Sequence, residues 1–147
     1  MDKKHFVNAD REMAAQFLNS APSGPLIMIQ LLKFRDVADY SGSSKSEPLK
    51  PVSGLWAFEH FLKTAIPLMI KAEGQFIYYG AAYPFLIGPA DEAWDRVLIL
   101  KQKSAEALLA LGQSAEFQSI SVHRTAALID SRLLPTQELT FSIKSAI

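Results

Sequence analysis

Histidine and arginine stand next to each other at positions 123 and 124, close to the end of a predicted helix. An imidazole titrates near neutral pH, and a guanidinium binds anions through a planar fork of N–H donors. His123 and Arg124 therefore have the chemistry to move a proton beside a bound anion. The alternative is structural, because cations at the C-terminus of a helix stabilise it by about 0.3–1 kcal/mol. The structural interpretation is the commoner of the two, and both stay open.

Asp95 and His60 form a second group of candidates. Asp95 lies near the start of a predicted strand over residues 94–101, where a carboxylate has to be paired or exposed to water. We expect a structural ion pair rather than an acid that orients a substrate. The arginines available for that pair are Arg124, Arg132 and Arg35. His60 lies on a predicted helix, off its main apolar face, and this placement is typical of a residue at the boundary of the core.

Other reactive chemistry is sparse in this sequence. The chain has no cysteine, which excludes disulfides, thiolate catalysis and thiolate metal sites. Its three histidines, His5, His60 and His123, lack the spacing of metal ligands, so we expect neither a metal site nor a bound cofactor. The sequence also lacks a Gly-rich phosphate loop, a G-x-S-x-G elbow and an H-E-x-x-H motif.

Composition excludes several further classes of protein. The 147 residues are 49% hydrophobic and 20% charged, which is ordinary for a soluble globular chain. Fifteen basic and fifteen acidic residues cancel without forming a basic stripe, so we expect no nucleic-acid partner. The first residues lack the apolar core of a signal peptide, and the uncharged stretch 76–90 is too short to span a bilayer. We therefore expect a cytoplasmic protein with no membrane partner.

Hydrophobic periodicity predicts the elements that must position these residues. Asn8 is a credible N-cap for the first helix, and Ser104 and Ser114 for two later ones, while Pro67 predicts a kink or restart inside the longest helix. The loop 35–53 is Ser-rich and is expected to be exposed and mobile, a natural lid. The predicted elements are a helix at 9–19, a strand at 25–34, a helix at 55–72, strands at 75–87 and 94–101, helices at 105–111 and 115–122, a strand at 125–133 and a strand-like tail around 139–143.

The order of these elements predicts one α+β domain over residues 1–147, with its core at about 25–134. The core order is β-α-β-β-α-β, the ferredoxin-like arrangement of an antiparallel sheet with helices on one face. Strands 25–34 and 94–101 are apolar on both faces, whereas an antiparallel sheet usually has one polar face. The second apolar face needs cover, and a second copy of the sheet is its simplest source. The terminal segments are the alternative cover.

Three stretches of the sequence carry a family resemblance. They read GPLIMIQLLKFRDVADY, IGPADEAWDRVLILKQKSAEALLAL and SAEFQSISVHRTAALIDSRL. Together they resemble a family of small uncharacterised proteins in the dimeric α/β-barrel superfamily, over roughly residues 9–135. The resemblance implies homodimers that pack sheet against sheet, each subunit with a pocket between its sheet and helices. Better-understood relatives include cofactor-independent quinol monooxygenases, lactone isomerases, aldoxime dehydratases and haem-handling enzymes.

The resemblance also bears on individual residues. The pairs Trp94-Asp95 and His123-Arg124 match the family pattern, whereas Gln30 replaces an asparagine that is common in the first strand. Phe58 and Phe61 stand where the family tends to have tyrosines, so the ligand is expected to be more apolar. In this superfamily His60 has the further alternatives of a base or an axial haem ligand.

These observations lead to two hypotheses. The first is a homodimer that binds a small apolar, oxygen-bearing compound in a pocket between helix 55–72 and the sheet, with or without catalysis of the monooxygenase or isomerase type. Its candidate ligand-binding residues are Gln30, His60, Asp95, His123 and Arg124. The second hypothesis is a structural or interaction dimer module without chemistry. A pocket lined by several of these residues favours the first, and a solid core favours the second.

Overall fold

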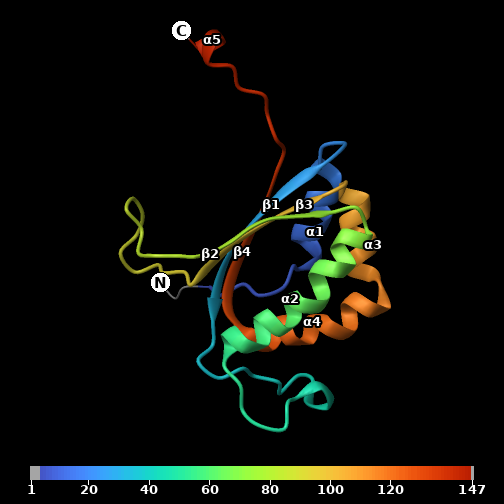
Figure 1. Cartoon of the computed structure of the whole chain (residues 1–147), viewed down its shortest axis with the longest axis vertical. Helices are drawn as coiled ribbons and strands as arrows, with labels where there is room; N and C mark the ends of the chain where they lie inside the picture. The colour runs from blue at the N-terminus through green and yellow to red at the C-terminus, as the bar shows by residue number, and fades with distance from the viewer. Residues whose placement is uncertain (1–3, 147) are drawn as a thin grey trace.

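The computed structural model of the chain describes residues 4–146. An antiparallel sheet lies on one side of the molecule, and helices pack along one of its faces (Figure 1). The fold is therefore α+β, as the sequence predicts. Its elements are α1 (Arg11–Ser20), β1 (Leu26–Phe34), the short 3-10 helix η1 (Ser44–Ser46), α2 (Gly54–Lys71), β2 (Gln75–Ala81), β3 (Arg96–Gln102), α3 (Ala105–Gln113), α4 (Ala115–Ala127), β4 (Leu128–Thr136) and α5 (Ile143–Ala146).

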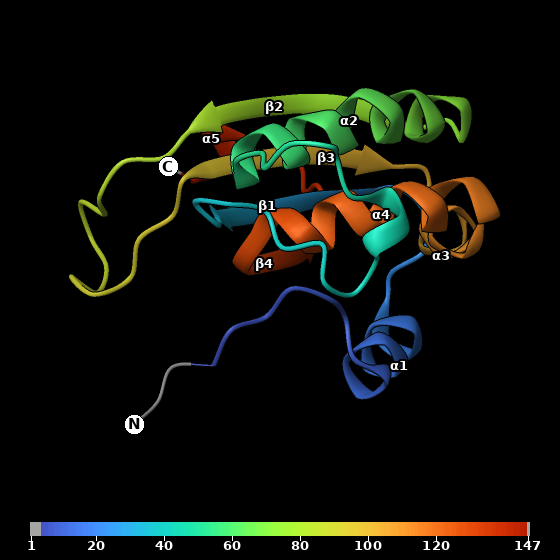
Figure 2. The same ribbon diagram turned by 90° about the horizontal axis from the view of Figure 1, so that it is seen from below.

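The sheet has four strands in the order β2-β3-β1-β4, and every neighbouring pair runs antiparallel. β1 lies in the interior of the sheet, where Ile29 stands opposite Ile99 of β3 and Leu134 of β4. β2 and β4 are the two edges, so the sheet is open. Figure 2 shows the same four strands side by side, with α2 and α4 lying across them.

The two ends of the sheet carry different segments of the chain. At one end of β1, Ile27 pairs with Thr136, the last residue of β4. At the other end, Leu32 pairs with Arg96, the first residue of β3. The chain beyond Thr136 and the connection 82–95 between β2 and β3 therefore leave the sheet from opposite ends, as Figure 1 also shows.

Alternation along β1 divides its side chains between the two faces of the sheet. Leu26, Met28 and Leu32 are almost fully buried and belong to the clusters that pack against the helices. Ile27 and Ile29, which point the other way, remain partly exposed. The prediction that both faces of this strand are apolar is therefore correct, and the helices cover one of them.

Helix α2 supplies most of the cover. Ser53 is its N-cap, with a hydroxyl that accepts a hydrogen bond from the Trp56 N–H. The helix continues through Pro67 as one element to Lys71, so the predicted restart is wrong. Pro67 is exposed, and water can take the carbonyl that its missing N–H leaves unpaired. The core residues of the helix fall on the opposite side and are Ala57, Phe58, Phe61, Leu62, Ala65 and Met69.

The structure corrects the predicted boundaries near the N-terminus and in the second strand. The N-cap of α1 is Asp10 instead of Asn8, because the Asp10 carboxylate accepts a hydrogen bond from the Met13 N–H at 2.8 Å. β2 ends at Ala81 rather than at residue 87, and the shift in its register falls between Phe76 and Tyr78. The aromatic stretch that follows belongs to the connection 82–95, which has no partner strand among the described residues.

Corrections also apply to the C-terminal third of the chain. α4 runs to Ala127, so β4 begins at Leu128 and not at Thr125. The three residues 125–127, Thr-Ala-Ala, are therefore helical, and α4 packs against α2. The predicted strand-like tail is absent, since residues 137–142 carry no regular structure and α5 follows.

Candidate functional site

His123 lies near the end of α4, where its imidazole meets a side chain from the long loop. The Tyr40 hydroxyl and the His123 Nδ1 are 2.7 Å apart, and the two rings are in edge-to-face contact. Ser114 fixes the start of this helix, because its hydroxyl accepts a hydrogen bond from the Phe117 N–H. This N-cap was predicted correctly.

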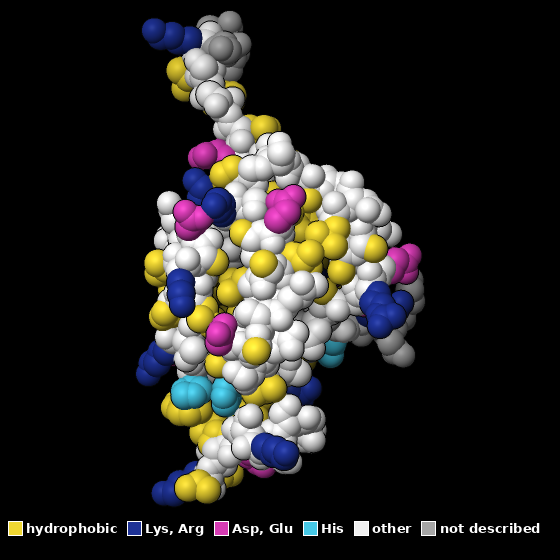
Figure 3. Space-filling view, turned by 90° about the vertical axis from the view of Figure 1, so that its right-hand side faces the viewer, with side chains coloured by type: hydrophobic (Ala, Val, Ile, Leu, Met, Phe, Trp, Pro, Cys, Tyr) yellow, Lys and Arg dark blue, Asp and Glu magenta, His cyan; other side chains and the backbone are white. Residues whose placement is uncertain are grey.

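His60 joins His123 from the neighbouring helix. The two imidazoles make an edge-to-face contact, with ring centroids 4.8 Å apart. One turn before His60 on α2, the Trp56 indole stacks on the imidazole at 4.9 Å and 8°. Trp56 is 46% exposed, and histidine and apolar side chains reach the surface together at the lower end of the helical layer (Figure 3). We call Tyr40, Trp56, His60 and His123 the aromatic–imidazole cluster.

The surroundings of the cluster set its protonation. Burial lowers the pKa of His123 below its ordinary value of 6.5, and the neighbouring His60 lowers that pKa further. Burial also raises the pKa of the Tyr40 phenol. His123 is therefore neutral at pH 7. If its proton is on Nδ1, it donates to the Tyr40 oxygen and leaves Nε2 free to take a proton; the other tautomer makes Nε2–H a donor.

The loop 35–53 is exposed over most of its length, as predicted, but it is anchored beside the cluster. Tyr40 is only 4% exposed. The Asp39 N–H donates to the carbonyl of Ala126 at 2.8 Å, and the Ala38 N–H donates to the carbonyl of Val52 at 2.9 Å. These bonds tie the loop to the end of α4 and close it on itself, so Tyr40 is held in place to orient His123.

Arg124 does not share the site of His123. Both residues lie on α4, where successive side chains are rotated by about 100° and so point in different directions. The guanidinium of Arg124 donates to the carbonyl of Val7 at 2.6 Å, and burial lowers the pKa of Arg124 to about 10. The carboxylate of Asp130 binds Arg132 instead, at 2.6 Å. Arg124 holds the N-terminal segment.

Asp95 and Gln30 also lie in structural surroundings. The Asp95 carboxylate accepts a hydrogen bond from the Phe34 N–H at 2.8 Å, so its partner is backbone rather than the predicted arginine. Gln30 is buried in β1, facing the helices between Leu98 of β3 and Leu133 of β4. Of the five residues predicted from the sequence, the structure brings together His60 and His123.

Sequence reasoning missed Tyr40 and Trp56. Trp56 precedes His60 by four residues, a spacing that places both on one side of a helix, so the stacked pair was open to prediction. Tyr40 lies in an irregular loop 83 residues before His123, and no periodicity links the two.

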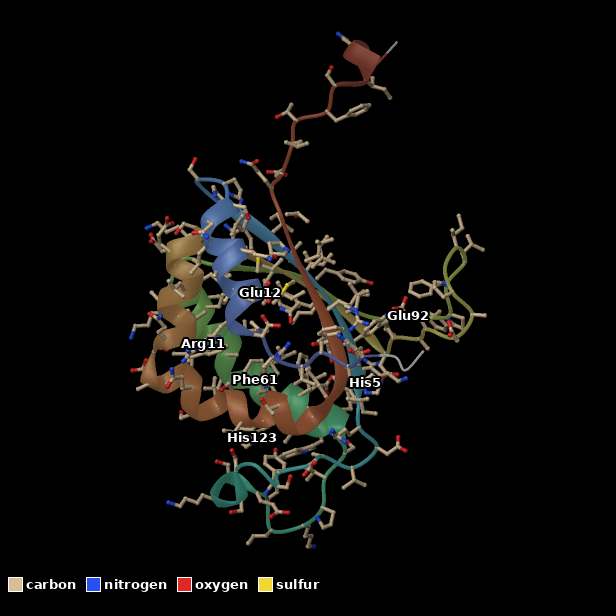
Figure 4. All side chains as sticks on the ribbon, turned by 180° about the vertical axis from the view of Figure 1, so that it is seen from behind. His5, Arg11, Glu12, Phe61, Glu92 and His123 are labelled. Carbon is tan, nitrogen blue, oxygen red and sulfur yellow. The ribbon has the colours of Figure 1, made fainter. Side chains whose placement is uncertain are left out.

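The pocket that the family resemblance implies, between α2 and the sheet, is filled by side chains. Phe58 and Phe61 of α2 form one buried cluster with Leu32 and Leu98 of the sheet. Figure 4 shows Phe61 inside the molecule, with His123 farther out toward the loop. The space between α2 and the sheet is therefore occupied by the chain's own side chains.

Two hollows lie elsewhere on the molecule. One, of about 320 Å³, is lined by the end of α1 and by α3. The other, of about 290 Å³, lies beside Arg132, whose guanidinium carbon is 5.0 Å from the ring centroids of both Phe6 and Trp94. That arginine is already paired with Asp130, so the contact secures the N-terminal segment against β4. Within the described residues, no three His, Asp or Glu side chains form a group that could hold a metal ion.

The chain shares its fold with solved structures of unknown function. The protein RPA0582 from Rhodopseudomonas palustris, a protein of unknown function, is 27% identical, with a TM-score of 0.82 over 93% of this chain and 99% of that chain. The methylated form of RPA0582 gives the same identity and TM-score over 92% of this chain and 96% of that chain. The sequence matches no protein-family model and no curated protein.

The shared fold supports the arrangement of strands and helices and says nothing of a reaction. Within residues 4–146, no helix is long and apolar enough to cross a membrane. The geometry of the aromatic–imidazole cluster is therefore the main ground for a functional argument.

Proposed function

We propose that this protein binds a small, apolar, oxygen-bearing compound at the aromatic–imidazole cluster. The observation that carries the proposal is the 2.7 Å hydrogen bond between the Tyr40 hydroxyl and His123 Nδ1. It holds one imidazole in a fixed orientation against a second imidazole, which in turn stacks on an exposed indole. Both imidazoles reach the surface instead of being fully buried in the core, so their ring nitrogens are accessible to a ligand.

The cluster offers two kinds of contact to such a compound. The flat, partly exposed face of Trp56 suits a planar ring, because offset stacking of aromatic rings contributes about 0.5–1.5 kcal/mol beyond burial. His60 and His123 offer ring nitrogens to an oxygen atom of the compound. An apolar or aromatic surface and a few well-placed polar groups are the usual elements of a small-molecule site.

The proposed chemistry is a cofactor-independent reaction of the isomerase or monooxygenase type. In an isomerisation, a neutral His123 takes a proton from one carbon of the ligand through Nε2 and returns it to another, so the composition of the ligand is unchanged. Tyr40 keeps the imidazole oriented during both transfers. His123 suits this role because its pKa lies below the usual value, which leaves it neutral at pH 7.

Ligand-induced stabilisation tests this proposal. A panel of phenols, quinones and aromatic lactones is screened by thermal unfolding, and a compound at 100 times its Kd should stabilise the protein by roughly 2.7 kcal/mol. Trp56→Ala should weaken binding of the best compound by roughly 2- to 13-fold, the equivalent of one stacking contact. His123→Ala should weaken it as well.

Two control variants separate the cluster from other parts of the chain. His5→Ala removes an exposed histidine that lies well away from His123 (Figure 4), and Arg124→Ala removes the buried cation that holds Val7. Both variants should bind the compound with unchanged Kd, although Arg124→Ala lowers stability. If Trp56→Ala and His123→Ala bind as tightly as the wild type, the cluster is not the site.

We also propose that the protein is a homodimer of the dimeric α/β-barrel kind, built from ferredoxin-like subunits. The strand order β2-β3-β1-β4 supports the ferredoxin-like description. Support for the dimer comes from the sheet face that the helices leave open. Its central side chains are Ile27, Ile29, Leu31, Val97 and Ile99.

The oligomeric state is the test of the dimer. Light scattering at micromolar concentration should give twice the mass of the chain, and a specific interface of this kind buries at least about 1,200 Å². Ile29 and Ile99 are paired at the centre of the open face, so Ile29→Lys should produce a monomer. A wild-type chain that stays monomeric at 100 µM, a concentration far above the Kd of a stable dimer, contradicts the proposal.

The second candidate function is a structural or interaction dimer without chemistry. The observation that favours it is the filled space between α2 and the sheet, where the family resemblance implies a pocket. A dimer that binds no member of the panel, with an intact cluster, is the result expected for this alternative.

A further inference from the structure

We propose that residues 137–146, which we call the C-terminal arm, dock on the connection 82–95 of a second copy of this chain. The inference rests on the proposed homodimer and adds to it a pair of contacts outside the sheet. Figure 1 shows the arm leaving the end of β4 and extending away from the rest of the molecule, and Figure 3 shows apolar side chains along it.

The apolar side chains of the arm have no cover within their own chain. Leu139 is 81% exposed, Phe141 78% and Ile143 72%. They alternate with Thr140 and Ser142, so an extended arm presents all three on one side. Exposed apolar side chains are common singly, but a contiguous row of large ones marks an interaction surface.

The arm begins at a well-anchored point. The Thr136 hydroxyl donates to the carbonyl of Ile27 at 2.9 Å, which holds the last residue of β4 to the interior strand β1. From there, the seven residues 137–143 reach about 23 Å when extended, at roughly 3.3 Å per residue. Four strands spaced by about 4.8 Å span about 14 Å, so the arm is long enough to cross a partner's sheet.

The connection 82–95 carries a matching set of exposed apolar side chains. Leu86 is 98% exposed, Ile87 92% and Tyr83 84%. The two segments are therefore complementary in apolar character.

The two segments cannot cover each other within one chain. They leave the sheet at opposite ends, because Thr136 pairs with Ile27 and Arg96 pairs with Leu32. A two-fold axis that lies in the plane of the open sheet face, perpendicular to the strands, reverses the strand direction of the second copy. The arm of one copy and the connection of the other then lie at the same end of the paired sheets. The arm of each copy then meets the connection of its partner, and both contacts are satisfied by the same symmetry.

The area involved is what a stable dimer needs. Burial of a large apolar side chain removes about 60–120 Å² of apolar surface from water. Three side chains on the arm and three on the connection make six per copy and twelve in the pair, or about 700–1,400 Å². Specific interfaces start near 1,200 Å² in total, so these contacts supply more than half of that area.

The experiment compares the dimer dissociation constants of matched variants by sedimentation equilibrium. Phe141→Glu places a charge on the arm and should raise the Kd at least tenfold, the equivalent of losing about 1.4 kcal/mol. The control is Leu49→Glu, which adds the same charge at a fully exposed leucine of the loop 35–53 and should leave the Kd unchanged.

Cross-linking identifies the contact itself. The chain has no cysteine, so a Leu86→Cys, Phe141→Cys double variant carries one reactive thiol on the connection and one on the arm. A short bis-maleimide should link two chains and not the two thiols of one chain. A monomeric wild type overturns the dimer and the arm contact together. A wild-type dimer that is unaffected by Phe141→Glu, or cross-linking within one chain, overturns the arm contact and leaves the dimer standing.

Discussion

Gly54, the first residue of α2, lies where three elements meet, and replacing it tests how the helices of the site are positioned. A Cβ atom at this position would lie 2.3 Å from the carbonyl oxygen of Arg35, at the end of β1. It would also lie 2.6 Å from the carbonyl oxygen of Ala127, at the end of α4. Both atoms belong to backbone that hydrogen bonds hold in place, because the Gly54 N–H donates to Arg35 O and the Arg35 N–H donates to Ala127 O.

The magnitude follows from two opposing effects. Alanine is favoured over glycine inside a helix by about 1 kcal/mol, whereas forcing an extra methyl into packed structure costs about 1–3 kcal/mol and more against backbone. We expect Gly54→Ala to lower the free energy of unfolding by about 2 kcal/mol and the Tm by about 4–8 °C. Urea unfolding followed by circular dichroism measures the change.

Gly112 provides the matched control, because it lies inside α3 and a Cβ there would meet no atom within 4 Å. Gly112→Ala should therefore raise the free energy of unfolding by about 0.5–1 kcal/mol. If Gly54→Ala is as stable as the wild type, or is stabilised like Gly112→Ala, the close approach of β1, α2 and α4 at this residue is wrong.

Three further predictions follow from individual contacts. The lowered pKa of His123 means that, as the pH falls, the unfolded chain takes up a proton before the folded chain does. The free energy of unfolding should therefore fall below about pH 6.5, by at most about 1.4 kcal/mol per pH unit. His123→Gln should reduce this pH dependence, as measured by urea unfolding between pH 7.5 and 5. Asp95→Asn weakens the bond from the Phe34 N–H and should lower the free energy of unfolding by about 1–2 kcal/mol; an unchanged value refutes that role. Ser114→Ala removes a helix N-cap and should lower it by about 1 kcal/mol, whereas Ser119→Ala, at an exposed position inside the same helix, should change it by less than about 0.5 kcal/mol.

Strong periodicity and capping made much of the fold predictable from the sequence. β1 and α2 were placed to within one residue, because long apolar patterns have few alternative structures. The N-caps at Ser104 and Ser114 were also found, since a serine before a helical run satisfies a free backbone N–H. The boundary between α4 and β4 was missed by three residues, because the short run Thr-Ala-Ala at 125–127 has no periodicity that separates a helix end from a strand start.

The candidate site was less predictable because its contacts are long-range. His60 and His123 are 63 residues apart, and only the packing of α2 on α4 brings them together. The guanidinium of Arg124 could bind an anion, but the sequence gives no sign that it already donates a hydrogen bond to the carbonyl of Val7. Asp95 was expected to pair with an arginine, whereas its carboxylate accepts a hydrogen bond from the backbone N–H of Phe34 at the end of β1.

The most direct test of the proposed site is a crystal structure with the best compound of the panel bound. We expect density for a planar ring against the exposed face of Trp56, with an oxygen atom within hydrogen-bond distance of an imidazole of His60 or His123. Density beside Arg132, or behind α2 with Phe58 and Phe61 displaced, would contradict it.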